Sequence, residues 1–274
     1  MDPLATIVGA VVGVLVGLTA TGGGALLTPA LVLGLGVPPS VAIGSDVLIA
    51  SVMKLAAGGA YAARRAVHWS TVRRLAAGSV PGALLGAALV GLLPDPWRDA
   101  VLVRAIGVAV TLAGFATLWR LLRPAAAAPT RTPGPVSTAL LGLAIGVLVG
   151  ATSVGSGSVL MAVLVTAWPL PAATLVGTDL IHALLLSSAA TLGHLAGGRV
   201  DFGLAATVLV GGLPGAWLGA RLAASVPERA LRGGLAAVLV IAGTTLAIGG
   251  TSRAARAATP TMSTSTAIDG KGRP

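Results

Sequence analysis

The sequence is too apolar for a soluble globular protein. Its 274 residues are 55% hydrophobic and only 9% charged, whereas soluble domains carry about 25% charged residues. The net charge of +10 comes from basic residues between apolar stretches, as the positive-inside rule predicts for cytoplasmic loops. We therefore expect a lipid bilayer, and no nucleic acid, as the large partner of this chain. The absence of cysteine excludes disulfides and thiolate chemistry.

Small residues dominate the apolar part of the chain. There are 39 glycines, and aromatic residues make up only 3%. Small side chains let membrane helices approach closely. The composition predicts a packed bundle of membrane helices, an all-α polytopic fold.

Apolar runs bounded by glycine, proline or charge follow one another along the chain. They lie near residues 4–20, 23–36, 41–62, 71–93, 99–122, 136–152, 155–168, 172–196, 203–222 and 230–250. The first run lacks the basic region that precedes the apolar core of a secretory signal, so it is predicted to be the first membrane segment.

The prolines of residues 123–135 could not lie inside one intact helix, so this stretch is predicted to be a linker. It separates a first transmembrane repeat, residues 1–122, from a second, residues 136–250. Residues 251–274 have no periodicity and are predicted to be a disordered tail without assigned function.

The two halves match each other at a constant spacing of 133 residues. Gly13–Gly17 reads GVLVG, as does the stretch at residues 146–150. The same spacing relates further pairs: Pro38 and Pro171, Gly44 and Gly177, Asp46 and Asp179, Gly78 and Gly211, Pro81 and Pro214, and Gly86 and Gly219. An internally duplicated membrane protein is the usual architecture of a secondary transporter, with its site at the repeat interface.

Each repeat begins with a segment too long for one membrane helix. Residues 4–36 would extend about 50 Å as a single helix, whereas the hydrocarbon core is about 30 Å thick. A break is predicted at Thr21-Gly22-Gly23-Gly24, and its equivalent lies at residues 154–157. Short, glycine-interrupted segments at matching positions indicate a transporter binding site.

The breaks also suggest how an anion could bind. A helix that starts after a break offers unpaired backbone N–H groups and the positive end of its dipole. Close helix packing or a sharp turn is the alternative explanation of these glycines. Neither turn has the Gly-Lys-Ser/Thr ending of a phosphate-binding loop, so ATP is not expected. The candidate substrate-binding residues of the breaks are Thr19, Thr21, Gly22, Gly23, Gly24, Thr152, Ser153, Gly155, Ser156 and Gly157.

The basic residues bear on the orientation of the repeats. Those at Arg64 and Arg65, Arg73 and Arg74, and Arg120 to Arg131 fall on one side, predicted to be cytoplasmic. An odd number of crossings per repeat would make the repeats inverted, and an even number would make them parallel. We favour inverted repeats of four to five hydrophobic segments, each with a glycine-broken first helix, because charges in a tail count for less.

Few ionisable residues lie inside the apolar segments, where each costs roughly 2.5–3.5 kcal/mol. Asp46 and Asp179 form a repeat-related pair, and each follows a glycine and a hydroxyl residue. They are candidates for proton or ion coupling, and a helix N-cap is the alternative. Lys54, in the same segment as Asp46, could supply a positive charge to an anion.

His182 lies three residues after Asp179, on the same helix face. An aspartate and histidine pair can relay protons in a membrane, and a structural core histidine is the alternative. No spacing resembles a zinc site, and no serine, histidine and aspartate set suggests a nucleophile. We expect no cofactor, no metal and no enzymatic activity.

These motifs together resemble the sulfite exporter TauE/SafE family of membrane permeases over about residues 4–250. The matching stretches include the triple glycine followed by Pro29, residues 42–46 with Lys54 downstream, residues 67–69 and 78–86, and residues 176–179, 198–202 and 212–215. Many members lack the two carboxylates, which a subset of the family has.

The resemblance implies a permease for sulfite or related sulfur oxyanions and organosulfonates, in a bacterial cytoplasmic membrane. Residues inside the bundle suggest proton coupling through Asp46, Asp179 and His182. Two alternatives remain: a proton- or cation-coupled transporter of another small solute, and a non-transporting membrane subunit whose basic loops dock a soluble partner.

Overall fold

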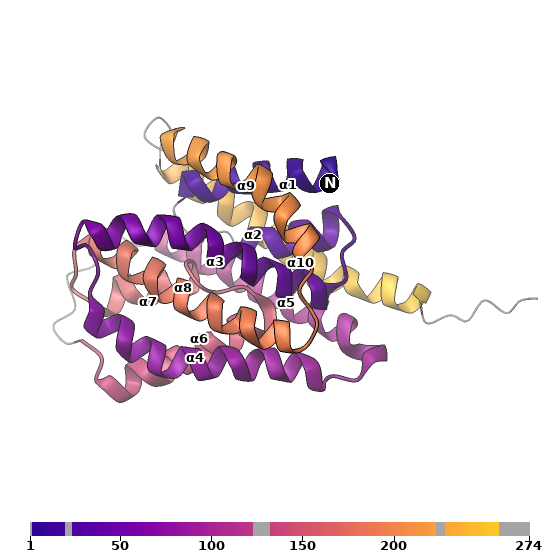
Figure 1. Ribbon diagram of the computed structural model, residues 1–274, viewed down its shortest axis with the longest axis horizontal. Helices are drawn as coiled ribbons and strands as arrows, with labels where there is room; N and C mark the ends of the chain where they lie inside the picture. The colour runs from indigo at the N-terminus through magenta and orange to yellow at the C-terminus, as the bar shows by residue number, and fades with distance from the viewer. Residues whose placement is uncertain (1, 20–23, 123–131, 223–227, 258–274) are drawn as a thin grey trace, which may run out of the picture.

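The structure is a computed structural model, and it describes residues 2–19, 24–122, 132–222 and 228–257. All regular secondary structure in this part of the chain is helical (Figure 1). The elements are α1 (Pro3–Thr19), α2 (Gly24–Pro29), the π-helix η1 (Ala30–Gly34), α3 (Pro39–Ala63), α4 (Trp69–Leu92), α5 (Asp95–Leu122), α6 (Pro135–Thr152), α7 (Val159–Ala167), α8 (Ala172–Ala196), α9 (Phe202–Leu222) and α10 (Glu228–Ala257).

The predicted all-α membrane fold is confirmed. Among the described residues, 6 helices are long and apolar enough to cross a membrane, and α1 is an apolar helix just under that length. Large apolar side chains cover the outer faces, such as Ile7, Leu92 and Ile241, which are 58%, 77% and 65% exposed. Such surfaces suit lipid, because water would penalise them.

The helix boundaries follow the predicted apolar runs closely, including the second break. After α6 ends, Ser153 adopts a left-handed conformation (φ 62°), and Gly155 and Gly157 have φ values of 125° and 95°. These values suit glycine and let the chain turn sharply before α7. In the first repeat α1 ends at Thr19 and α2 begins at Gly24, and residues 20–23 lie outside the described part.

The C-terminal helix extends beyond the predicted end of the second repeat. α10 reaches Ala257, past the boundary expected at residue 250. The structure therefore differs from the expectation that residues 251–257 belong to an irregular tail. Residues 258–274 lie outside the described part.

Two helix pairs pack through glycines, and each pair joins the two halves of the chain. Along α1 and α9, Gly9 faces Val208 and Gly13 faces Gly212, so the two helices run parallel. The pair α4 and α6 packs in the same way. In both pairs a Cβ atom on the facing glycines would collide with backbone of the other helix: Gly9, Gly13, Gly17, Gly211, Gly215 and Gly219 in the first, and Gly78, Gly82, Gly86, Gly142, Gly146 and Gly150 in the second.

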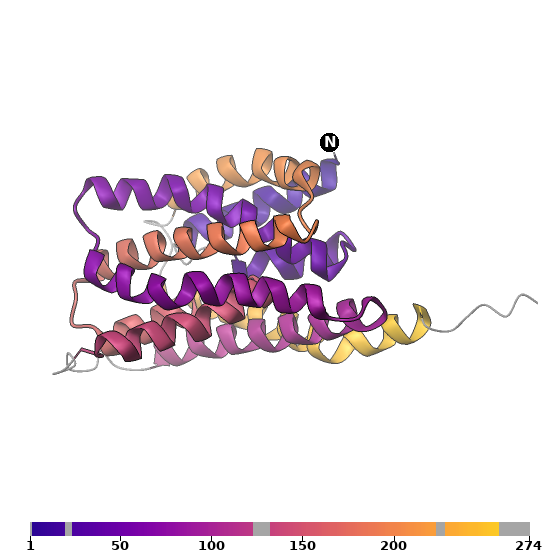
Figure 2. The same ribbon diagram turned by 60° about the horizontal axis from the view of Figure 1, so that its bottom comes forward.

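The centre of the bundle is a crossing of α3 and α8, which run antiparallel (Figure 2). The start of α3 lies near the end of α8, where Gly44 approaches His194 and Arg199. Equivalent helices of inverted repeats must run antiparallel, whereas those of parallel repeats would run parallel. This crossing supports the inverted arrangement, although the duplication itself stays a prediction from the sequence.

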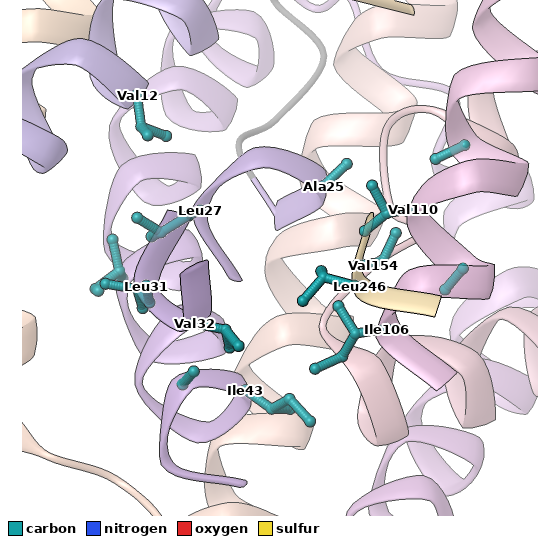
Figure 3. Close-up of a cluster of buried hydrophobic side chains, with 14 of the residues drawn as sticks. Val12, Ala25, Leu27, Leu31, Val32, Ile43, Ile106, Val110, Val154 and Leu246 are labelled. Atoms are coloured by element: carbon teal, nitrogen blue, oxygen red, sulfur yellow. The ribbon is translucent and has the colours of Figure 1, made fainter. Parts of the chain in front are cut away.

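The short helices α2 and η1 are buried among the longer ones (Figure 3). Leu27 and Leu31 of this segment belong to one apolar cluster with Ile43 of α3, Ile106 of α5 and Val154 of the second break. The segment after the first break is therefore held next to the break of the other half.

Candidate functional site

Two matching motifs each contact a loop of the other half of the chain. Gly44-Ser45-Asp46 of α3 contacts the loop after α8, and Gly177-Thr178-Asp179 of α8 contacts the loop after α3. A Cβ atom on Gly44 would collide with the carbonyl of Arg199, and one on Gly177 with the carbonyl of Ala66. Glycine is therefore required for this close approach.

The hydroxyl residues of the same motifs hold the two loops by hydrogen bonds. Ser45 Oγ accepts a hydrogen bond of 3.0 Å from the N–H of Asp201, and Thr178 Oγ1 accepts one of 2.9 Å from the N–H of His68. The first two residues of each motif thus fix the backbone of the other half, and the third carries a carboxylate into the bundle.

The interpretation of these carboxylates as helix N-caps is wrong. Asp46 lies two turns inside α3, which begins at Pro39, and Asp179 lies equally deep in α8, which begins at Ala172. Their exposed fractions are 0% and 3%. Neither carboxylate is at a helix end, so each of them needs partners from other helices.

Asp46 is held by hydroxyl groups from both halves of the chain. Its Oδ2 accepts hydrogen bonds from Thr28 Oγ1 and, at 2.8 Å, from Ser153 Oγ. Its Oδ1 is buried without a partner. Asp46 therefore joins α2 of the first half to the break of the second, and one oxygen stays available.

Lys54 lies inside the bundle, 3% exposed, as the cost of a lipid-facing ammonium predicts. Its Nζ donates to Ser156 Oγ at 2.9 Å and to Ser187 Oγ at 3.2 Å. It feels the charges of Asp46 and Asp179, yet no described carboxylate forms an ion pair with it. The ammonium has three donors, and hydroxyl groups use two of them.

Asp179 is buried in the middle of the bundle, on α8. Its carboxylate lies in the field of Lys54 and Arg120. Its Oδ1 is buried without a partner. Asp179 therefore brings a second carboxylate, with one oxygen unsatisfied, into the interior of the bundle.

His182 does not form the predicted hydrogen-bonded pair with Asp179. Its Nε2 lies 2.8 Å from Ser79 Oγ of α4, and its Nδ1 has no partner. Because Ser79 orients the ring from another helix, the three-residue spacing along α8 does not decide what the histidine contacts. His182 lies in the field of Lys54 and belongs to the same buried cluster.

The other predicted break residues differ in their roles. Thr152 donates to the carbonyl of Leu148 at 2.7 Å and so bonds its own helix. Gly155 shapes the turn through its positive φ. Of the candidates in the first half, Thr21, Gly22 and Gly23 lie outside the described residues. Nothing is described of the surroundings of Thr19 and Gly24, at the flanking helix ends.

Buried polar atoms without partners occur in three residues that interact electrostatically with Lys54, and in Ser158, two residues after the Ser156 that binds it. They are Asp46 Oδ1, Ser158 Oγ, Asp179 Oδ1 and His182 Nδ1. Buried polar groups are nearly always hydrogen-bonded in proteins, so such a concentration needs an explanation. No group of three or more metal-ligating side chains occurs within the described ranges. The cluster offers both donors and acceptors to a small polar ligand.

Four further hydroxyl residues contribute to the cluster without having been predicted from the sequence: Thr28, Ser79, Ser158 and Ser187. Three of them have no polar equivalent in the other half, where Met161, Gly212 and Ala25 stand in place of Thr28, Ser79 and Ser158. A search based on duplicated positions could not find them. A search for hydroxyl residues on glycine-rich helix faces would have included Ser79.

Buried ionisable groups beside broken helices, within a bundle of membrane helices, are typical of membrane transporters. The family described as "Sulfite exporter TauE/SafE" matches residues 5–246. The chain belongs to this family and is a multi-pass membrane transporter of it.

Proteins similar to this chain carry transporter names. It is 34% identical over 245 residues to "Probable membrane transporter protein YjnA" of Bacillus subtilis, covering 86% of this chain and 96% of that protein. A "Probable membrane transporter protein" of Xylella fastidiosa is 29% identical over 222 residues, 78% of this chain and 82% of that protein. No solved structure shows a significant match.

Proposed function

We propose that this protein is a permease for small anions, with the substrate bound at the cluster around Lys54. The observation that carries the proposal is the buried Lys54 ammonium, to which the described residues offer hydroxyl groups as hydrogen-bond partners. A buried charge without a directly paired counter-ion is expensive, and no described carboxylate forms an ion pair with Lys54. An anion that accepts the remaining N–H donor would form the direct ion pair that Lys54 lacks.

Sulfite, related sulfur oxyanions and organosulfonates are the substrates that we propose. The description of the family supports this chemical class. A sulfur oxyanion presents several acceptor oxygens, and Ser156, Ser158 and Ser187 could donate to them beside Lys54. The seryl hydroxyls would thereby replace water around the anion.

We further propose that transport is coupled to protons through Asp46 and Asp179, with His182 nearby. With both carboxylates ionised, these two charges outweigh that of Lys54 and repel an anion. Proton binding to either carboxylate removes this excess. Anion and proton would therefore bind together, because each makes the site more favourable for the other.

The charges at the two ends of the bundle support one orientation in the membrane. α3, α5 and α9 all end on the side at which α4, α6 and α10 begin (Figure 1). Most basic residues lie there, including Arg64, Arg73 and Arg221. We propose that this end faces the cytoplasm of a bacterial cell and that the repeats are inverted.

Flux measurements on purified protein in liposomes test the anion permease. We expect sulfite uptake that Lys54→Met reduces about tenfold or more, because the only buried ammonium of the cluster is lost. Met preserves the length and the apolar part of the side chain, and thermal unfolding checks that the variant is folded. Unchanged sulfite flux in Lys54→Met would show that the lysine is structural.

A second candidate is a proton- or cation-coupled transporter of a different solute. The excess of carboxylates over ammonium groups in the cluster favours it. Flux assays in which sodium, potassium and pH gradients are varied separately distinguish the two. Cation flux without any dependence on a sulfur oxyanion would favour the second candidate.

A further inference from the structure

The loop between α8 and α9 carries an arginine that the proposed function does not use. Arg199 lies where α8 ends and α9 begins, at the end of the bundle opposite to the proposed cytoplasmic end. Its side chain is half-buried. Its Nε donates to His194 Nδ1 at 3.2 Å, and its Nη2 donates to the carbonyl of Ala87 in α4 at 2.8 Å. Two hydrogen bonds therefore fix the position of the guanidinium.

His194 connects this guanidinium to a further helix. It is fully buried, and its Nε2 lies 2.8 Å from the carbonyl oxygen of Gly150 in α6. Because a carbonyl can only accept, Nε2 carries the proton, and Nδ1 of the neutral ring accepts from Arg199. Arg199 is thus attached to α4 directly and to α6 through the histidine.

Arg199 has unused donors and no counter-ion. A guanidinium has five N–H donors, and Nη1 makes no hydrogen bond or ion pair with any residue in the described ranges. Carboxylates of the same end are used by other groups: Asp95 pairs with Arg98, and Asp99 and Asp201 accept N–H groups in the first turns of α3 and α9. A guanidinium with free donors is suited to an oxyanion.

The equivalent loop of the first half shows that its backbone contact does not require an arginine. Ala66 stands 133 residues before Arg199. Its carbonyl packs on Gly177 as that of Arg199 packs on Gly44. An alanine therefore suffices for this contact between the halves. The guanidinium of Arg199 adds a fixed cation to the non-cytoplasmic end alone.

Two glycines leave the unpaired nitrogen uncovered. A Cβ atom on Gly91, in the last turn of α4, would lie 3.1 Å from Arg199 Nη1, and one on Gly197 would collide with the guanidinium. Both glycines are exposed. A side chain at either position would crowd or displace Nη1, whereas the bare backbone leaves it room for a ligand.

We propose that Arg199 forms an outer binding site for the transported oxyanion, at the non-cytoplasmic end of the permease. The inference rests on the proposed function and adds a second site to the cluster around Lys54. The carbonyl of Arg199 lies against Gly44, ten residues before Lys54, so the loop is about 15 Å from the lysine along α3. Asp46 lies between them on the same helix. An anion taken up from outside binds Arg199 first and passes Asp46 before it reaches Lys54.

Arg98 is the matched control, because it lies at the same end of α4 but has its partners. It pairs with Asp95 and donates to the carbonyls of Val90 at 3.2 Å and Leu93 at 2.9 Å. Its charge contributes to the positive field of this end without an unpaired cation. An effect confined to Arg199 therefore indicates a site, and an equal effect of both indicates only the field.

The first test measures sulfite uptake into right-side-out vesicles at several sulfite concentrations. We expect Arg199→Gln to raise the KM about tenfold, as the loss of a charge-assisted hydrogen bond predicts, with little change in the maximal rate. Arg98→Gln should leave the KM near the wild-type value. An unchanged KM in folded Arg199→Gln, or an equal rise in Arg98→Gln, would overturn the outer site.

Gly91→Ala tests the same site with the arginine in place. The added methyl group would crowd Nη1, and we expect the KM to rise about fivefold, at the lower end of the cost of overpacking. The control is Gly234→Ala in α10, whose Cβ would meet no atom within 4 Å. If Arg199→Gln does not fold, Gly91→Ala decides, and a KM equal to that of Gly234→Ala would overturn the site.

Binding of radiolabelled sulfite in detergent separates the outer site from the proposed function. We expect two sulfite ions per wild-type chain and one in each of Arg199→Gln and Lys54→Met. One ion per wild-type chain, lost in Lys54→Met, would leave the permease standing and overturn the outer site. No bound sulfite at all would overturn both.

The phosphate of a lipid headgroup has the same oxyanion chemistry and is the other source of a ligand for Arg199. Native mass spectrometry of the purified protein distinguishes the two sources. Phosphatidylglycerol that stays on the wild type and is lost in Arg199→Gln, together with a single bound sulfite, would show a lipid site and overturn the proposal. Two sulfite ions bound to the lipid-free wild type would support it.

Discussion

The glycine-lined helix pairs and the polar α3/α8 crossing use the duplicated sequence in opposite ways. In the pairs α1/α9 and α4/α6, each glycine at the helix contact of one pair has an equivalent glycine 133 residues away in the other pair, as Gly13 and Gly146 show. At the crossing, Lys54 stands opposite Ser187, and His182 has an isoleucine, Ile49, as its equivalent. The packing is the same in both halves, whereas the ionisable chemistry is unequal.

The comparison suggests a division of labour. The matched surfaces need backbones in contact, which only small residues permit. At the α3/α8 crossing the two halves differ, so the protein has one ammonium, Lys54, beside its two carboxylates. Changes in the pairs should therefore affect folding, and changes at the crossing should affect transport.

The largest expected effect is on folding, from a methyl group added to a glycine-lined pair. Gly146→Ala should destabilise the protein by about 1–3 kcal/mol, because the new Cβ would collide with the backbone of Ser79 and α4 would have to move. Thermal unfolding in detergent measures it. The control is Gly59→Ala within α3, whose Cβ would meet no atom within 4 Å. Equal stability of the two variants would contradict the packing role.

The next effect concerns transport and sharpens the contrast between Lys54 and Ser187. Lys54→Ser should lower sulfite flux about tenfold or more. The double change Lys54→Ser with Ser187→Lys should restore most of it, because Nζ already lies 3.2 Å from Ser187 Oγ. An ammonium from either helix then reaches the same place. Failure of a folded double variant to regain flux would show that the lysine must come from α3.

A third effect concerns the pH dependence of flux. Asp46→Asn should weaken it, because the amide oxygen can still accept the hydrogen bonds of Thr28 and Ser153 while the titratable group is lost. Sulfite uptake at several external pH values measures the change. Wild-type pH dependence in both Asp46→Asn and Asp179→Asn would exclude coupling through the carboxylates.

The smallest effect tests whether the hydrogen bonds of Ser45 and Thr178 to the two loops contribute equally to the free energy of unfolding. Ser45→Ala and Thr178→Val each remove the acceptor for one loop N–H, of Asp201 and His68 respectively. Each should cost about 1 kcal/mol of stability and leave sulfite flux near the wild-type level. Thermal unfolding measures both. A large loss of flux in one variant alone would place that loop in the transport cycle.

The sequence predicted the helices well because each apolar run ends at glycine, proline or charge. The break after Thr152 was predicted as the equivalent of the break in residues 4–36, where a single helix would exceed the membrane. The packing partners were not predicted. Glycine spacing shows that one face of a helix can pack closely, but it does not identify the partner. It therefore could not predict that α1 packs on α9 and not on a helix closer to it in the sequence.

The site was predicted in part. The cost of charge in a membrane identified Lys54, Asp46 and Asp179, and the glycine break identified Ser153 and Ser156. The hydrogen bonds depend on how helices from distant parts of the chain meet. Thr28 and Ser79 sit in apolar runs, where a single hydroxyl gives no signal, and only the fold brings them to Asp46 and His182.

The exchange of helices between the halves has a consequence for biosynthesis. α1 leaves the ribosome before all of α2 to α8, and its packing partner α9 follows only after them. The glycine face of α1 packs on α9 in the folded protein, so this face lacks its partner until residues 202–222 enter the membrane. The first half therefore cannot complete its packing on its own, and the bundle closes only after α9 of the second half has been inserted.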